Sequence, residues 1–199
     1  MRGGDSADFR RVFLCDAFSC PDRGAMRFLT ISGSLRAGSS NTGVLQAIAS
    51  VAPSGVEIVS FRGLAEIPAF NPDLDVEPGP LPVEFFRNEL KRSQAVLIST
   101  PEYAHGLPGS LKNALDWVVR SGELYEKPIA LINPSPRSTF AQASLTEVLN
   151  TMSARIIQEA CITLPASGPL TPPGILADAQ LSAMLRSSVE TLLRSVGPA

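Results

Sequence analysis

The stretch that decides the fold is Arg27-Phe-Leu-Thr-Ile-Ser-Gly-Ser-Leu-Arg-Ala-Gly-Ser-Ser-Asn-Thr42. Its first six residues form a short apolar run that ends at Gly33, which is typical of a buried strand leading into a loop. Helical spacing follows directly, because Val44, Ile48 and Val51 recur at i, i+4 and i+7. The stretch therefore predicts a strand, a polar loop and a helix in succession.

The same alternation of strands and helices continues along the chain. Further strands are expected at residues 56–61, 95–100 and 129–132, with a brief one at 155–158. Further helices are expected after Pro82, after Pro108, around residues 145–152 and over 177–196, the last preceded by a long loop at 165–173. Because strands that alternate with helices form right-handed crossovers, the order predicts an α/β doubly wound fold, with a parallel sheet between two layers of helices.

Length and composition favour one domain. A chain of 199 residues can form a single core. Residues 1–25 are excluded from the fold as a disordered leader or a start assigned too early, and the domain is expected over 26–199. Cys15, Cys20 and Cys161 have no metal-ligand spacing, so free thiols in a reducing cytoplasm are expected, with a Cys15–Cys20 redox pair as the less favoured alternative.

Charge and hydropathy exclude two classes of partner. The formal net charge of −2 offers no attraction for nucleic acid. The longest apolar runs have the length of strands, so no segment is expected to cross a membrane. A soluble cytoplasmic protein without a bound metal is the expectation.

The loop from Gly33 to Thr42 is suited to a phosphate group. It offers hydroxyl, amide and guanidinium donors, and the positive end of a helix dipole follows it. These donors belong to Ser34, Arg36, Ser39, Asn41 and Thr42. The alternative is that the polar residues only cap the helix. The chain has no Gly-x-Gly-x-x-Gly and no Gly-Lys-Ser/Thr here, and no cysteine that could act as a nucleophile.

A second motif follows the third expected strand and reads Pro101-Glu-Tyr-Ala-His-Gly-Leu-Pro-Gly-Ser-Leu-Lys-Asn-Ala-Leu-Asp-Trp117. Together with Gly33, Ser34, Arg36, Ser39 and Asn41 of the first loop, it resembles the NADPH-dependent FMN reductase family. That group includes quinone, azo-dye and chromate reductases. The resemblance extends over about residues 27–195.

The resemblance implies a flavodoxin-like, three-layer fold with a five-stranded parallel sheet in the order 2-1-3-4-5. It implies that the donors of the first loop hold the FMN phosphate. It also implies a second set of residues near the isoalloxazine: Pro101, Glu102, Tyr103, Ala104, His105, Gly106 and Ser135. Two departures bear on this site. Ala104 stands where the family usually has Asn, and Asn133-Pro-Ser-Pro-Arg-Ser-Thr139 stands where relatives often carry glycines.

The implied function is an oxidoreductase in which NADPH or NADH reduces bound FMN by a ping-pong mechanism. The acceptor is a small molecule: a quinone, an azo compound, a metal oxyanion or free flavin. No residue is assigned an acid–base role, His105 included, because the cofactor carries the chemistry. The alternatives are a non-enzymatic electron carrier or redox-sensing protein, and a domain that has lost its flavin. The family also implies a homodimer or homotetramer.

Overall fold

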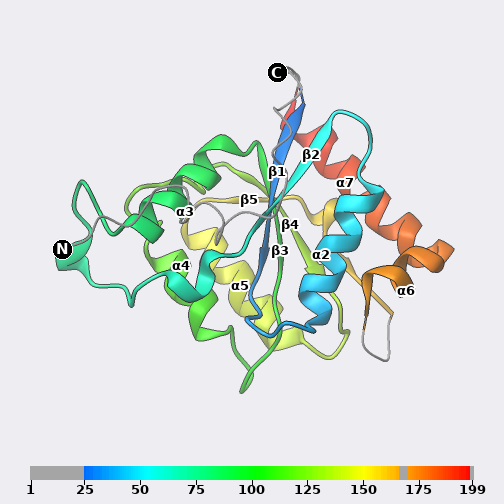
Figure 1. The fold of residues 1–199 in the computed structure, drawn as a ribbon, viewed down its shortest axis with the longest axis horizontal. Helices are drawn as coiled ribbons and strands as arrows, with labels where there is room; N and C mark the ends of the chain where they lie inside the picture. Colours follow the sequence, from blue (N-terminus) through cyan, green and yellow to red (C-terminus); the bar gives the residue numbers. More distant parts are fainter. Residues whose placement is uncertain (1–24, 166–169, 198–199) are drawn as a thin grey trace, which may run out of the picture.

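The computed structural model describes residues 25–165 and 170–197 (Figure 1). The leader, with Cys15 and Cys20, lies almost wholly outside these residues. The strands are β1 Met26–Ser32, β2 Val56–Phe61, β3 Ala95–Ser99, β4 Pro128–Asn133, β5 Arg155–Ile156 and β6 Ile162–Thr163. The helices are α2 Ser40–Val51, α3 Leu81–Arg92, α4 Gly109–Asp116, α5 Thr139–Thr151, α6 Pro172–Ala177 and α7 Ala179–Val196. Three single 3-10 turns are η1 Gly63–Glu66, η2 Pro72–Leu74 and η3 Gln158–Ala160.

All paired strands run parallel in the order β2-β1-β3-β4-β5, which confirms the predicted topology. The fifth strand of the sheet differs from the single strand expected over 155–158. It is divided into β5, which pairs with the start of β4, and β6, which pairs with its end. The turn η3 between them contacts α7, where the Ser188 hydroxyl donates to the carbonyl of Ala160 at 2.5 Å. The strand is interrupted because the Ala160 N–H donates to the Ile157 carbonyl and the Cys161 N–H to the Gln158 carbonyl, which closes the turn.

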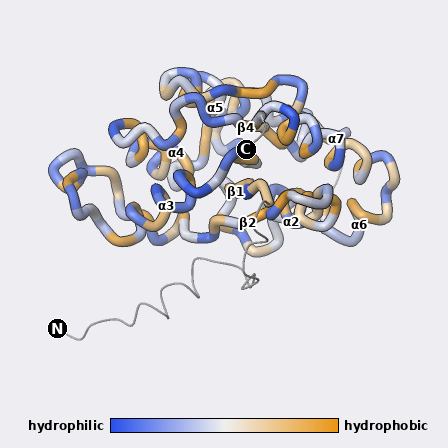
Figure 2. The backbone as a smooth tube through the Cα atoms, turned by 90° about the horizontal axis from the view of Figure 1, so that it is seen from above, coloured by the Kyte–Doolittle hydropathy of each residue, from blue (hydrophilic) through white to orange (hydrophobic). Residues whose placement is uncertain are grey.

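Alternation along the strands produces two cores, one on each face of the sheet. Leu29, Ile98 and Ile129 face one core, in which α3, α4 and α5 supply the helical side chains. Phe28 and Leu97 face the other, which α2, α6 and α7 cover. Figure 2 shows β1 and β4 between these two layers. The structure is therefore the three-layer arrangement that the strand–helix order predicts.

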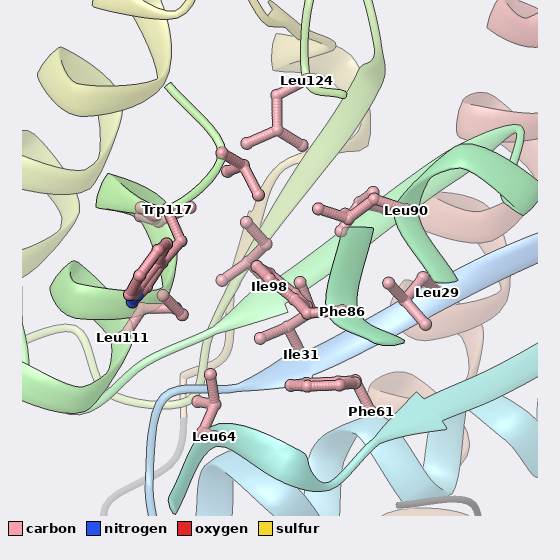
Figure 3. Packing of buried hydrophobic residues seen from close by; sticks show 14 of the residues in the cluster. Leu29, Ile31, Phe61, Leu64, Phe86, Leu90, Ile98, Leu111, Trp117 and Leu124 are labelled. Carbon is pink, nitrogen blue, oxygen red and sulfur yellow. The ribbon is translucent and has the colours of Figure 1, made fainter. Parts of the chain in front are cut away.

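The core beneath α3 and α4 is built around large side chains. Phe86 and Leu90 of α3 and Trp117 at the end of α4 are fully buried, and Figure 3 shows them over Ile31 and Ile98. Fully burying each such side chain contributes about 1.5–3 kcal/mol. This core fixes β1 and β3, whose carboxyl ends carry the two sequence motifs.

Two helices near the carboxyl end differ from the sequence-based expectation. The loop predicted over 165–173 ends earlier, because Pro172 begins α6 and the Thr171 hydroxyl accepts from the Gly174 N–H at 3.3 Å. The final helix α7 begins after Asp178, whose carboxylate accepts from two backbone N–H groups. Within the described ranges, no helix has the length and apolar character needed to cross a membrane.

Candidate functional site

The two motif loops lie at one edge of the sheet because they follow neighbouring parallel strands. The loop after β1 and the loop after β3 emerge side by side, and the loop after β4 follows next to them; all three lie toward the lower edge in Figure 1. The Gly33 N–H donates to the carbonyl of Ser99 at 2.8 Å, and the Ser99 hydroxyl donates to Asn41 Oδ1 at 2.8 Å. The end of β3 thus anchors both ends of the first loop.

Gly33 is required by this close contact. A Cβ at this position would clash with the Thr100 Oγ1 atom and would lie 3.0 Å from Leu111 Cδ2. Any other residue would therefore separate the loop after β1 from the end of β3. The glycine keeps the first loop close to the second.

The five residues of the first loop that the sequence predicts as donors to a phosphate have different hydrogen-bond partners in the structure. Ser39 caps α2, since its hydroxyl accepts from the Asn41 N–H at 3.2 Å. The Thr42 and Ser32 hydroxyls lie 2.9 Å apart, and the Ser34 hydroxyl accepts from the Arg36 N–H at 3.3 Å. Each of these hydroxyls keeps bonding capacity for a ligand. Capping is therefore one part of what the polar residues do.

Arg36 and Asn41 differ most in their surroundings. Arg36 is exposed, so its guanidinium is accessible from solvent. Asn41 is 6% exposed, and its Oδ1 is occupied by Ser99. Asn41 therefore joins the start of α2 to the end of β3, a structural role that the sequence pattern alone does not reveal.

The segment Tyr103–Gly106 forms a tight hairpin. The Tyr103 N–H donates to the Gly106 carbonyl at 3.1 Å and the Gly106 N–H donates back at 3.0 Å. Ala104 and His105 between them have φ of 50° and 57°, as the two central residues of a type I′ turn require. The Asn expected at position 104 in relatives tolerates this conformation, whereas Ala is strained in it.

Two contacts dock this hairpin on the start of α5. Glu102 Oε2 accepts from the Ala141 N–H at 3.0 Å, which satisfies a donor that Ser138, the N-cap residue, leaves without a side-chain partner. The rings of His105 and Phe140 stack with centroids 4.3 Å apart and planes 13° apart. Ser99 and Phe140 carry no motif signal, so the sequence-based reasoning did not select them.

The loop after β4 is a compact turn. Asn133 Oδ1 accepts from the Ser135 N–H at 3.1 Å, and the Ser138 N–H donates to the Ser135 carbonyl at 3.1 Å. Pro136 and Arg137 are exposed, whereas Pro134 is buried. Ser135 lies at the same sheet edge as the hairpin, but its N–H is already bonded within its own loop.

Cys161 directly precedes β6. Its Sγ accepts from the Leu131 N–H at 3.2 Å, and burial raises the pKa of the thiol, an effect only partly opposed by this bond. Among the described residues, no group of three or more His, Cys, Asp or Glu could hold a metal ion.

The residues of the first loop fit the phosphate of FMN. Residues 33–42 contain an arginine, four hydroxyl-bearing side chains and no carboxylate, and the first turn of α2 has no acidic residue. A dianionic phosphate needs such a set of donors at the positive end of a helix dipole. The hairpin after β3 would then lie toward the ring of the same ligand.

Comparison with proteins of known structure supports the fold. A flavoenzyme NAD(P)H:(acceptor) oxidoreductase from Paracoccus denitrificans superposes with a TM-score of 0.66 at 24% identity, covering 85% of this chain and 98% of that one. An archaeal flavodoxin superposes with a TM-score of 0.54 at 14% identity, covering 84% and 99%. The flavodoxin-like fold is thereby confirmed.

Sequence comparison gives closer relatives. A quinone reductase of Escherichia coli is 37% identical over 106 residues, which is 53% of this chain and 55% of that protein. An NAD(P)H-dependent FMN reductase of Pseudomonas aeruginosa is 38% identical over 112 residues, or 55% of this chain and 60% of that protein. The chain thus spans little more than half the length of the curated relatives it matches.

The family model described as NADPH-dependent FMN reductase matches residues 26–167, which is well over half of the chain. The match begins at the first residue of β1 and includes all three loops at the carboxyl edge of the sheet. FMN and a reduced nicotinamide, the cofactors expected from the sequence, are those of this family. The chain therefore belongs to the NADPH-dependent FMN reductase family.

Proposed function

We propose that this protein is an FMN-dependent NAD(P)H oxidoreductase that transfers electrons to small-molecule acceptors of the quinone, azo, metal-oxyanion or free-flavin type. The observation that carries the proposal is the carboxylate-free donor loop at the end of β1, held against the hairpin that follows β3. A cytoplasmic location is part of this proposal.

The chain contributes binding and orientation. Ser34, Arg36, Ser39 and Thr42 hold the phosphate, and Asn41 positions the loop through Ser99. Main-chain groups of Pro101–Gly106 meet the polar edge of the ring, while the Glu102 and His105 contacts fix this hairpin on α5. Bound FMN supplies hydride acceptance and electron release, so no side chain is needed as an acid or base.

Donor and acceptor use one open face in turn, which is a ping-pong cycle. Tyr103 is 55% exposed and His105 is exposed, so the hairpin is accessible to planar molecules from solvent. The loop after β4 forms its own hydrogen bonds within residues 133–138. One open face favours successive occupancy by nicotinamide and acceptor.

Self-association is a further part of the proposal. The apolar stripe of α4 lies inside its own core, since Leu111 and Leu115 are fully buried, and so it is not available as a subunit interface. Exposed apolar side chains instead occur near η2 and beyond α4, at Leu74, Val76 and Val119. We place the homodimer or homotetramer contact there. Sedimentation of only monomer at micromolar concentration would contradict it.

The function is tested by adding FMN to the purified chain, desalting, and recording the flavin absorbance before and after anaerobic NADPH. Retained flavin that bleaches, and recovers when a quinone is added, is the expected result. Retained flavin that NADPH and NADH do not bleach would instead identify an electron carrier. A desalted sample without flavin absorbance would contradict flavin binding itself.

A further inference from the structure

An aromatic pair lies at the rim of the candidate site. The rings of His105, in the hairpin after β3, and Phe140, in the first turn of α5, stack with centroids 4.3 Å apart and planes 13° apart. Both side chains are exposed, Phe140 by 53%, and Tyr103 of the same hairpin is exposed as well. Because the loops after β3 and β4 leave the same edge of the sheet, these rings lie beside the place proposed for the flavin. The edge therefore presents aromatic faces to solvent where an acceptor would approach.

The hairpin fixes the orientation of this pair. His105 has a φ of 57°, in the left-handed region, which is uncommon for a residue other than glycine. The two backbone bonds between Tyr103 and Gly106, and the bond from α5 to Glu102, hold the turn that carries it. Backbone that its surroundings hold in such a conformation is frequent at ligand-binding sites. Since the ring is already ordered, a ligand that stacks on it loses less affinity to the ordering of side chains.

The charges around the pair do not favour a compact inorganic anion. The start of a helix attracts anions, but at α5 the Glu102 carboxylate already accepts from the Ala141 N–H at 3.0 Å. Arg137 is the only cationic residue among residues 133–142, and it is exposed, so its charge is solvated and screened. A metal oxyanion that approaches α5 therefore meets a carboxylate, whereas a planar molecule meets aromatic rings.

From this arrangement we infer that Phe140 is a specificity-determining residue, which together with His105 binds planar aromatic acceptors by stacking and favours them over compact inorganic anions such as metal oxyanions. The inference rests on the proposed function and narrows its range of acceptors. A planar acceptor gains from stacking and from the burial of apolar surface, and a compact anion gains from neither. In the proposed reaction, NAD(P)H and one proton convert a quinone to its hydroquinone, so the pair binds the acceptor and takes up no electron or proton itself.

The inference is tested by anaerobic steady-state kinetics of the FMN-loaded full chain with NADPH. The measured quantity is kcat/KM for the acceptor, determined for a naphthoquinone, which is planar, and for ferricyanide, which is a compact inorganic anion. Phe140→Leu keeps an apolar side chain without the ring, and Phe140→Tyr keeps the ring. Tyr125→Ala removes an exposed aromatic ring outside the motif loops and is the matched control. FMN retention and bleaching by NADPH are measured for every variant.

The expected result is a fall of about three- to tenfold in the ratio of the naphthoquinone value to the ferricyanide value in Phe140→Leu, which is the range that one aromatic stack provides. Phe140→Tyr and Tyr125→Ala should keep the ratio of the unmodified protein. An unchanged ratio in Phe140→Leu, an equal fall in Phe140→Leu and Phe140→Tyr, or loss of FMN from Phe140→Leu would overturn the inference.

Failure of this inference is distinct from failure of the proposed function. Unmodified protein whose bound FMN is not bleached by NADPH contradicts the proposed function. Protein that retains FMN, is bleached by NADPH and keeps the same ratio after Phe140→Leu contradicts the role of Phe140 alone.

Discussion

Ala104 carries the clearest local strain in the candidate site. Its φ of 50° places an L-residue in the left-handed region, which costs about 1 kcal/mol, whereas Asn is tolerated there. Ala104→Asn is therefore expected to raise the free energy of unfolding by about 0.5–1 kcal/mol in urea denaturation. The same change at Ala69, an exposed loop residue without a positive φ, is the matched control and should have little effect. A destabilised Ala104→Asn protein would contradict this reading of the hairpin.

Glu102 connects the hairpin to α5 through one hydrogen bond. Glu102→Ala removes the acceptor for the Ala141 N–H and is expected to cost about 1 kcal/mol of stability. Glu102→Gln keeps an acceptor and should lose less. Glu147→Ala, on the exposed side of the same helix, is the control. We further expect Glu102→Ala to weaken FMN binding, measured by flavin fluorescence. Equal stability of Glu102→Ala and Glu102→Gln would exclude the capping role.

The sequence indicates which residues of the motif loops are suited to bind a ligand, but it does not indicate several of their hydrogen-bond partners within the protein. Ser34, Arg36 and Thr42 stand out in the sequence because a polar loop follows an apolar strand. Asn41 is predicted to donate to the ligand through its amide nitrogen, and its Oδ1 in addition accepts from the Ser99 hydroxyl, 58 positions along the chain. Contacts of this kind depend on the pairing of β1 with β3, which no local pattern encodes.

At the scale of elements, the helix α4 holds the connection between β2 and α3. Asn113 Oδ1 accepts from the Phe70 N–H at 2.7 Å, and its Nδ2 donates to the Pro68 carbonyl at 2.9 Å. The Trp117 indole N–H donates to the same carbonyl at 2.8 Å. The second half of the sequence motif therefore stabilises the segment 67–70.

Asn113→Ala leaves the Phe70 N–H and the Pro68 carbonyl without this partner. We expect a loss of about 1–3 kcal/mol in the free energy of unfolding, measured by chemical denaturation. Lys112→Ala removes only an exposed pair with Asp116 on the same helix, so it should change stability by less than about 1 kcal/mol. If the two variants lose equal stability, Asn113 does not hold the connection as described.

Strand positions could be read closely from the sequence, and short elements could not. β2 occupies residues 56–61 as expected, since an apolar run bounded by turn residues defines it. β5 lies within the brief strand expected at 155–158, but it contains only two residues, and β6, also of two residues, is too short to show any periodicity. α6 begins within a proline-rich stretch, and such a stretch predicts a loop from sequence. A helix can nevertheless start there, because prolines are compatible with its first positions.

At the scale of the whole molecule, the Cys161 thiol links stability to pH. Its pKa is raised by burial, so above the ordinary thiol pKa the unfolded chain releases this proton before the folded chain does. The free energy of unfolding should therefore fall as pH rises through that range. Cys161→Ser, which does not titrate there, should show a smaller decline in urea denaturation at pH 8 to 10. Parallel declines for both proteins would contradict the assignment.

At the scale of the whole molecule, the alternation of strands and helices determines the layered fold, and the positions of the loops determine which residues can contact a ligand. Parallel strands bring their carboxyl ends to one edge, so the alternation of strands and helices predicts that the loops after β1 and β3 lie at the same edge of the sheet. The cavity of about 400 Å³ that the donor loop forms with the ends of β1 and β2 could not be predicted, because Thr30, Ser60 and Arg62 carry no motif signal and line it only in the folded chain.

The central claim is that the loop after β1 binds a phosphate, and the comparison of FMN with riboflavin tests it most directly. Riboflavin has the same ring without the phosphate, so fluorescence titration of both isolates this one group. We expect much tighter binding of FMN than of riboflavin, and a smaller difference between them in Arg36→Gln. Equal affinity for FMN and riboflavin in the unmodified protein would contradict it.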